Sequence, residues 1–200
     1  MRKLNIGCGL DLLGPKSEWL NIDIQAIHHS RPDVDFRVGN LLDLWEVTGA
    51  ELFDEVRASH VLEHIGLDSI SNVLHQCNGV LQIGGSMKIV FPDFGQVVEM
   101  YKEEYLSEIS LVKLEVENVT VKSLNKLRMM TYLMIAPNSE GIGEHKTILT
   151  PELLAIVARG EGFMVWAVRR GYPRNIDTTV VLQKEYGTRS PGLDHYAADL

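Results

Sequence analysis

The sequence predicts an α/β protein with a mostly parallel seven-stranded sheet, helices on both faces and a helical cap insertion. Short apolar runs alternate with longer amphipathic ones, which is typical of strands connected by helices in a parallel sheet. The first run ends in a glycine turn, a frequent feature of such sheets. A chain of 200 residues can form one domain with a full core, so residues 1–200 are interpreted as a single domain.

Seven short apolar runs predict the strands of this sheet. They are residues 3–6, 19–24, 35–38, 55–59, 86–91, 163–169 and 178–183. A helix is expected between the fourth and fifth strands, because apolar residues there recur with helical spacing. These residues are Ile70, Val73, Leu74, Cys77, Val80 and Leu81. Gly84 and Gly85 are expected to end this helix. A later helix is expected to begin with Thr150 as its N-cap and Pro151 at its first position.

Two further segments complete the predicted organisation. Residues 94–143 form a helical pattern longer than a crossover needs, and we interpret them as the cap insertion. This cap is expected to select the substrate, and its apolar residues 131–136 are a possible homodimer surface. Residues 186–200 are interpreted as a polar C-terminal tail.

The composition restricts the partners of the protein. A formal net charge of -8 disfavours nucleic acid, whose binding depends on neutralising phosphates with Lys and Arg. No apolar run approaches the length of a membrane span, about 18 residues or more. We therefore expect a cytoplasmic protein with neither a nucleic acid nor a membrane as its partner. Cys8 and Cys77 carry no spacing signature and are expected to be buried free thiols.

Candidate binding residues follow the predicted strands. The turn Gly7-Cys8-Gly9 follows the first strand, and glycine lets the backbone approach a ligand closely. A Gly-x-Gly turn alone is a weak signal, since an ordinary turn also explains it. Asp23 ends the second strand, where a carboxylate can accept hydrogen bonds from ribose hydroxyls, and Asn40 follows the third. Ligands bind at the carboxyl ends of strands in open α/β sheets, so these residues predict a nucleoside site.

The stretch HVLEH at residues 60–64 permits two interpretations. As H-x-x-E-H it matches the zinc signature of inverted zincin peptidases, in which both histidines lie on one helix face. Here it follows a predicted strand directly, and Gly66 interrupts any long helix. We therefore interpret it as the exit of the fourth strand and the first turn after it, and expect no metal.

Taken in order, the motifs resemble the class I S-adenosylmethionine-dependent methyltransferases, and most of all their type-11-like branch. The matching stretches are KLNIGCG (3–9), WLNIDI (19–24), VGNLLDL (38–44), FDEVRASHVLEHI (53–65), VLQIGGSMKIVFPDF (80–94) and EHKTILTPELLAIVARGEGF (144–163). The resemblance implies a Rossmann-like fold with S-adenosyl-L-methionine as cofactor and S-adenosyl-L-homocysteine as product. The cofactor-binding residues that it implies are Asn5, Gly7, Gly9, Asp23, Ile24, Asn40, Leu41, Ser59 and His60.

The expected activity is methyl transfer to an oxygen or nitrogen acceptor on a small molecule or glycan precursor. His64 and His145 are alternative general bases, and Asp93 could pair with either. A structural role for each histidine remains open. Two alternatives also remain: an inactive binding module and a nicotinamide-dependent enzyme. Asn5 stands where the family usually has an acidic residue, which favours the binding module. Leu12 stands where a dinucleotide fingerprint has its third glycine, which disfavours the nicotinamide-dependent enzyme.

Overall fold

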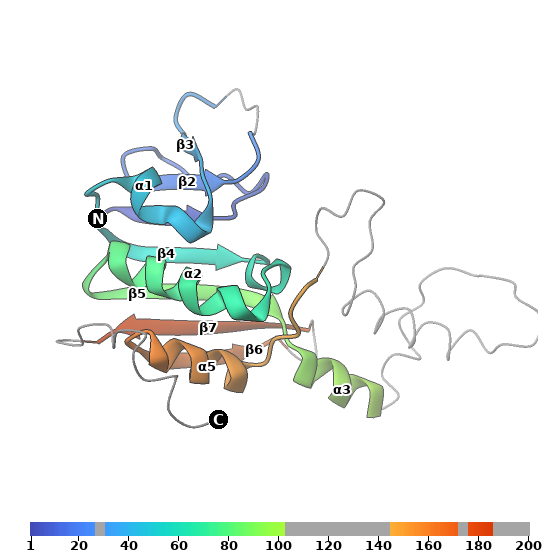
Figure 1. The fold of residues 1–200 in the computed structure, drawn as a ribbon. Helices are drawn as coiled ribbons and strands as arrows, with labels where there is room; N and C mark the ends of the chain where they lie inside the picture. Colours follow the sequence, from blue (N-terminus) through green and yellow to red (C-terminus); the bar gives the residue numbers. More distant parts are fainter. Residues whose placement is uncertain (27–30, 103–144, 172–175, 186–200) are drawn as a thin grey trace, which may run out of the picture.

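The fold is given by a computed structural model that describes residues 1–26, 31–102, 145–171 and 176–185. Its strands form one sheet in the order β3-β2-β1-β4-β5-β7-β6 (Figure 1). The strands are β1 (Lys3–Ile6), β2 (Trp19–Asp23), β3 (Asp35–Val38), β4 (Phe53–Ser59), β5 (Leu81–Pro92), β6 (Phe163–Arg170) and β7 (Asp177–Lys184). The α-helices are α1 (Leu44–Thr48), α2 (Leu67–Val80), α3 (Phe94–Lys102) and α5 (Pro151–Gly160), and the 3₁₀ turns are η1 (Leu41–Asp43) and η2 (Leu62–His64).

The sheet is mixed, with parallel pairing from β3 through to β5. Strand β7 runs antiparallel to both of its neighbours, β5 and β6. The predicted seven-stranded, mostly parallel sheet is therefore confirmed. Consecutive parallel strands end at one edge of the sheet, and this places the residues that follow β1, β2, β3 and β4 close together.

The core lies between one face of the sheet and the helices α1, α2 and α5, which cover that face (Figure 1). The helical stripe predicted from apolar spacing is confirmed for five of its six residues, since α2 buries Ile70, Val73, Leu74, Cys77 and Val80, whereas Leu81 is the first residue of β5. The opposite face carries alternate side chains of the same strands, and on β1 and β4 these are polar: Lys3, Asn5, Glu55 and Arg57. Helical cover of the second face, which the sequence also predicted, is not shown by the described residues.

The predicted end of α2 at Gly84 and Gly85 is wrong. The helix ends at Val80, and β5 begins with the next residue. The pairing between β4 and β5 shifts register at this point, so residues 82–85 form an irregularity in the strand. Gly84 takes a φ of 77°, and a Cβ on Gly85 would lie 2.9 Å from the carbonyl oxygen of Gln82. The two glycines therefore serve a bulge inside β5 instead of a helix end.

The connection between β1 and β2, residues 7–18, contains no helix. Hydrogen bonds from Asn21 hold this loop in place. Its side chain accepts from the N–H of Leu13 (2.9 Å) and donates to the carbonyl oxygens of Leu13 (2.8 Å) and Asp35 (3.0 Å). Because Asn21 is fully buried, these bonds also satisfy its own amide.

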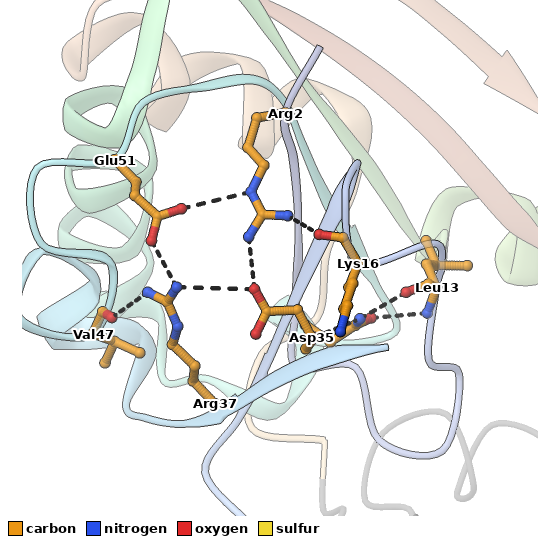
Figure 2. Close-up of polar contacts among 8 residues, drawn as sticks. Arg2, Leu13, Lys16, Asp35, Arg37, Val47 and Glu51 are labelled. Carbon is orange, nitrogen blue, oxygen red and sulfur yellow. Dashed lines mark hydrogen bonds and ion pairs between the residues drawn. The ribbon is translucent and has the colours of Figure 1, made fainter. Parts of the chain in front are cut away.

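The amino ends of the strands are tied together by an ion-pair cluster (Figure 2). Arg2 lies 2.7 Å from Asp35 and 3.6 Å from Glu51, and Arg37 lies 2.6 Å from Glu51. Arg2 also donates to the carbonyl oxygen of Lys16. The cluster joins β1, β3 and the segment before β4 at the edge where these strands begin, so it leaves the opposite edge free for a ligand site.

The predicted N-cap of the later helix is confirmed, because the Thr150 hydroxyl accepts from the N–H of Leu153 and Pro151 opens α5.

Of the predicted cap insertion, residues 94–143, only α3 is described. The remainder of the insertion, its possible homodimer surface and the predicted tail 186–200 lie outside the described residues. No helix in the described part of the chain is both long and apolar enough to cross a membrane.

Candidate functional site

A cavity of about 590 Å³ lies where β1, β2 and β4 end and where the chain turns from β3 into η1. Its lining comes from the segments that follow these strands, from the start of α2 and from Lys146. The lining residues predicted from sequence are Gly7, Gly9, Asp23, Ile24, Asn40, Leu41, His60 and His64. The structure thus brings together eight of the twelve candidate site residues around one cavity.

The glycine turn has a backbone that other residues would strain. Gly7 and Gly9 take φ values of 56° and 48°, in the left-handed region. A Cβ on Gly7 would lie 2.7 Å from the methyl groups of Val61, whereas a Cβ on Gly9 would meet nothing within 4 Å. Gly7 is therefore required by packing, while Gly9 leaves open space beside the cavity.

Asp23 is held in a fixed orientation by the backbone. Its Oδ2 accepts from the N–H of Gly9 at 2.9 Å, and its Oδ1 accepts from the N–H of Gln25 at 2.9 Å. Each carboxylate oxygen has a second lone pair, so Asp23 can accept further hydrogen bonds from a ligand. The carboxylate lies at the end of β2 and lines the cavity, where a pair of hydroxyl donors could reach it.

The segment after β3 supplies a second, largely apolar wall. The Asn40 side chain accepts from the N–H of Leu42 at 3.0 Å and so caps η1. Leu41 and Leu42 follow in the turn and line the cavity with Ile24, which is 68% exposed. An exposed isoleucine and two leucines beside an amide form a surface suited to a flat, partly polar ring.

The stretch HVLEH is the exit of β4, as we interpreted it. β4 ends at Ser59, His60 takes a φ of 55°, and a single 3₁₀ turn, η2, contains the last three residues of the stretch. His60 and His64 therefore do not share one face of an α-helix, and the zincin geometry is absent from this stretch. Gly66 precedes α2 as its N-cap.

His60 lines the cavity and lies between two carboxylates. Its Nδ1 is 3.3 Å from Oε1 of Glu63, and its Nε2 is 3.6 Å from Oδ2 of Asp177. Interaction with Glu63 raises the pKa of His60, partial burial opposes this, and the charge of Asp177 adds to it. The imidazole therefore gains positive charge more readily than an isolated histidine would.

The two candidate bases lie side by side. The ring centroids of His64 and His145 are 5.0 Å apart, with the rings inclined at 63°. His64 lines the large cavity, whereas His145 and Glu63 line a small adjoining one of about 10 Å³. A group bound in the large cavity would therefore meet His64 before His145. Their catalytic roles remain predictions.

Asp93 does not line the large cavity. It is 1% exposed, and its Oδ1 accepts from the N–H of Gly95 at 2.9 Å, as an N-cap of α3 would. Its Oδ2 accepts from the hydroxyl of Thr178 at 2.9 Å and lies 3.5 Å from Nε of Arg170. These contacts account for its burial, and its predicted pairing with a catalytic histidine stays a prediction.

Asn5 and Ser59 are also absent from the lining. Asn5 is 1% exposed and donates to the carbonyl oxygen of Asp11 (2.8 Å) and to Oδ1 of Asn21 (3.0 Å). Ser59 is the last residue of β4 and pairs with Val90 of β5. Ser59 directly precedes His60, which lines the cavity, and Asn5 lies two residues before Gly7, which also lines it. The predicted contacts of Asn5 and Ser59 with a cofactor remain untested.

Sequence reasoning missed several polar residues at the site. Gln25, Ser69 and Lys146 line the cavity, and Glu63 is buried behind it. Gln25 could have been found because it follows Asp23 directly. Lys146 could not, because only tertiary folding brings the segment before α5 against η2.

The sequence matches no protein-family model, and no curated protein resembles it at a significant level. Its fold, however, is shared with solved methyltransferase structures. A SAM-dependent methyltransferase from Methanosarcina mazei aligns with a TM-score of 0.53 and 16% identity, covering 92% of each chain. Magnesium protoporphyrin IX methyltransferase (ChlM) from Synechocystis PCC 6803 with bound SAH aligns with a TM-score of 0.54 and 10% identity, and the match covers 92% of this chain and 74% of that one.

The N-methyltransferase NodS from Bradyrhizobium japonicum WM9, in complex with S-adenosyl-l-homocysteine, aligns at 0.52 with 13% identity. The match covers 92% of this chain and 77% of that one. At these identities the similarity establishes the fold alone. The chain thus has the Rossmann-like fold of class I S-adenosylmethionine-dependent methyltransferases.

Proposed function

We propose that this protein is an S-adenosylmethionine-dependent methyltransferase of the type-11-like branch. It would transfer a methyl group to an oxygen or nitrogen atom of a small molecule or glycan precursor. The observation that carries the proposal is the position of Asp23, which lines the cavity at the end of β2 beside the glycine turn of β1. Within a methyltransferase fold, this carboxylate is suited to ribose hydroxyls.

The described residues fit this cofactor. Asp23 would accept hydrogen bonds from the two ribose hydroxyls through lone pairs that the N–H groups of Gly9 and Gln25 leave unused. Ile24, Leu41 and Leu42 would pack on the adenine, and the amide of Asn40 would contact its polar edge. Gly9 would let the backbone approach the ligand, because no side chain projects there.

S-adenosylmethionine, when bound, supplies an electrophilic methyl group on its sulfonium sulfur. The protein's part is to align donor and acceptor and to exclude water. His64 lines the cavity and would remove the acceptor proton where the acceptor must lose one, with His145 behind it as the alternative base. The cap would select the acceptor and could form a homodimer contact, and we place the enzyme in the cytoplasm.

Isothermal calorimetry with S-adenosylmethionine, S-adenosylhomocysteine and NAD tests the proposal. We expect both adenosyl compounds to bind and Asp23→Asn to weaken them about 10- to 100-fold, since hydrogen bonds to a charged group contribute about 1.5–3 kcal/mol. Glu46→Gln is the matched control, because Glu46 is exposed on α1, outside the cavity lining, and loses the same charge.

The outcomes separate the alternatives. Binding of neither adenosyl compound would sink the proposal, and binding of NAD instead would favour a nicotinamide enzyme. Binding without methyl transfer to any hydroxyl or amine acceptor tested would favour a binding module. Equal weakening by Asp23→Asn and Glu46→Gln would show that net charge, and not the position of Asp23, controls affinity.

A further inference from the structure

Glu63 is a buried carboxylate to which no described residue donates a hydrogen bond. Its side chain is 3% exposed, and neither carboxylate oxygen accepts a hydrogen bond from any residue that the structure describes. His60 approaches Oε1 to 3.3 Å, an ion-pair distance without hydrogen-bond geometry. Buried carboxylates in proteins are normally paired, hydrogen-bonded or bound to a metal ion. His60 gives Glu63 a neighbouring positive charge, but the described residues offer its two oxygens no hydrogen-bond donor, so both oxygens keep lone pairs for a further ligand.

Two imidazoles lie next to this carboxylate. Glu63, His64 and His145 each present one possible ligand atom, and these three atoms all lie within 4.8 Å of one another. His64 follows Glu63 in η2, whereas His145 comes from the segment before α5, 81 positions further along the chain. Folding has therefore assembled two nitrogen ligands and one oxygen ligand from distant segments.

Backbone hydrogen bonds fix this arrangement. The carbonyl oxygen of Glu63 accepts from the N–H groups of Lys146 (2.7 Å) and Thr147 (3.1 Å). The hydroxyl of Thr147 donates to the carbonyl oxygen of Ile65 at 2.6 Å. These bonds clamp residues 145–147 against η2 and so hold the imidazole of His145 beside Glu63. The ligand set is attached to a braced backbone, as a metal site requires.

We propose that Glu63, His64 and His145 bind a divalent transition-metal ion, most suitably Zn²⁺. Two imidazoles and one carboxylate are the protein ligands of a common class of zinc site, which leaves a fourth position open. Bonds of about 2.1 Å place tetrahedral ligand atoms about 3.4 Å apart, so side-chain rotation must shorten the separations, which reach up to 4.8 Å, by up to about 1.4 Å. The proposal departs from the sequence-based expectation that no metal binds.

The site differs from the zincin signature that HVLEH suggested. That signature would use His60 with His64, whereas the third ligand here is His145, which no local motif identifies. The open position matters because His64 also lines the 590 Å³ cavity. An ion held by His64 would therefore lie at the cavity wall, within reach of an oxygen or nitrogen atom of a molecule bound there. In the metal-bound state the ligating nitrogens of His64 and His145 would not act as general bases, and the ion itself would lower the pKa of an acceptor group bound to it.

Metal binding to the whole protein, measured without any adenosyl compound, tests the proposal independently of the proposed methyl transfer. The chelator-treated protein is titrated with ZnCl₂ by calorimetry and its thermal unfolding is followed, with MgCl₂ as the comparison. We expect one Zn²⁺ per chain with a dissociation constant on the order of micromolar or lower, and Mg²⁺ at least about 100-fold weaker. Zn²⁺ should raise the unfolding temperature.

Variants locate the ion. His64→Ala, His145→Ala and Glu63→Gln should each weaken Zn²⁺ at least about 100-fold, while His75→Ala should not. His75 is the matched control because it is half-exposed on α2 and contacts Glu161, away from the cluster. The metal-free Glu63→Gln protein should unfold at about the same temperature as the wild type or higher, because the lost ion pair with half-exposed His60 is offset by the removal of a buried charge for which the described residues offer no hydrogen-bond donor.

Three results would overturn the proposal. The first is no Zn²⁺ binding by the intact wild-type protein. The second is binding that survives His64→Ala and His145→Ala, which would place the ion elsewhere. The third is a marked fall in the metal-free stability of Glu63→Gln, which would show that this carboxylate serves the fold through a contact other than a metal ion.

Discussion

The N–H of Gly9 donates to Oδ2 of Asp23 across 2.9 Å, so the glycine turn after β1 and the carboxylate after β2 form one structural unit. The bond joins two neighbouring parallel strands at the edge where they end. It orients the carboxylate before any ligand arrives, which lowers the entropic cost of ordering the site on binding.

Gly7→Ala and Gly9→Ala should have different effects. Gly9→Ala adds a methyl group in open space at positive φ, which should cost about 1–2 kcal/mol of stability and weaken any ligand that approaches the turn. Gly7→Ala adds a clash with Val61 to the same strain and should cost about 3 kcal/mol or more. Urea unfolding and adenosyl-ligand calorimetry measure the two effects. Equal losses of stability would contradict the packing role of Gly7.

Asn5→Asp should destabilise the protein although an acidic residue is usual at this position in the family that the sequence resembles. The amide of Asn5 donates to oxygens of Asp11 and Asn21, and a carboxylate cannot donate. The oxygens of buried Asn21 and of Asp11 would then face a buried negative charge, with Arg57 as partial compensation. We expect a loss of about 2 kcal/mol or more in urea unfolding. Unchanged stability would show that the loop rearranges around the carboxylate.

Gly79→Ala should destabilise α2 even though alanine is the better helix former by about 1 kcal/mol. A Cβ at this position would lie 2.2 Å from the ring of Trp45 on α1. In a Trp45→Ala background the clash is gone, so the same substitution should stabilise by about 1 kcal/mol. Urea unfolding of the wild type, the two single variants and the double variant forms a double-mutant cycle. Its critical result is whether the effect of Gly79→Ala on the free energy of unfolding changes sign when Trp45 is replaced.

Cys8 should be inert toward iodoacetamide in the native protein. Burial raises its pKa to about 12, and the charge of Asp23 adds to this effect. At pH 8 a thiol with that pKa is ionised only about once in ten thousand molecules, and the thiolate is the reactive form. Native protein should therefore react at least about 100-fold more slowly than urea-unfolded protein. Rapid native labelling, located by mass spectrometry, would contradict the burial of Cys8.

Periodicity determined much of the fold by itself. Apolar spacing predicted α2 and all seven strands, because burial on one face of an element imposes a local repeat that a single sequence displays. The local chemistry of Thr150 and Pro151 likewise predicted the start of α5. The glycines at positions 84 and 85 were misinterpreted, since glycine with a positive φ, as at Gly84, is common both in a strand bulge and at the end of a helix.

The edge of the sheet was predictable too, which is why Gly9, Asp23 and Asn40 were expected near one another. Contacts between distant segments were not. The pairing of Glu63 and His64 with His145 depends on how the segment before α5 lies against η2, and that is fixed by backbone hydrogen bonds to Glu63 and Ile65. Sequence patterns by themselves determined the strands and their ends, because local repeats record burial. Only the tertiary structure decided which side chains meet behind the cavity, because contacts across 81 positions leave no local repeat to read.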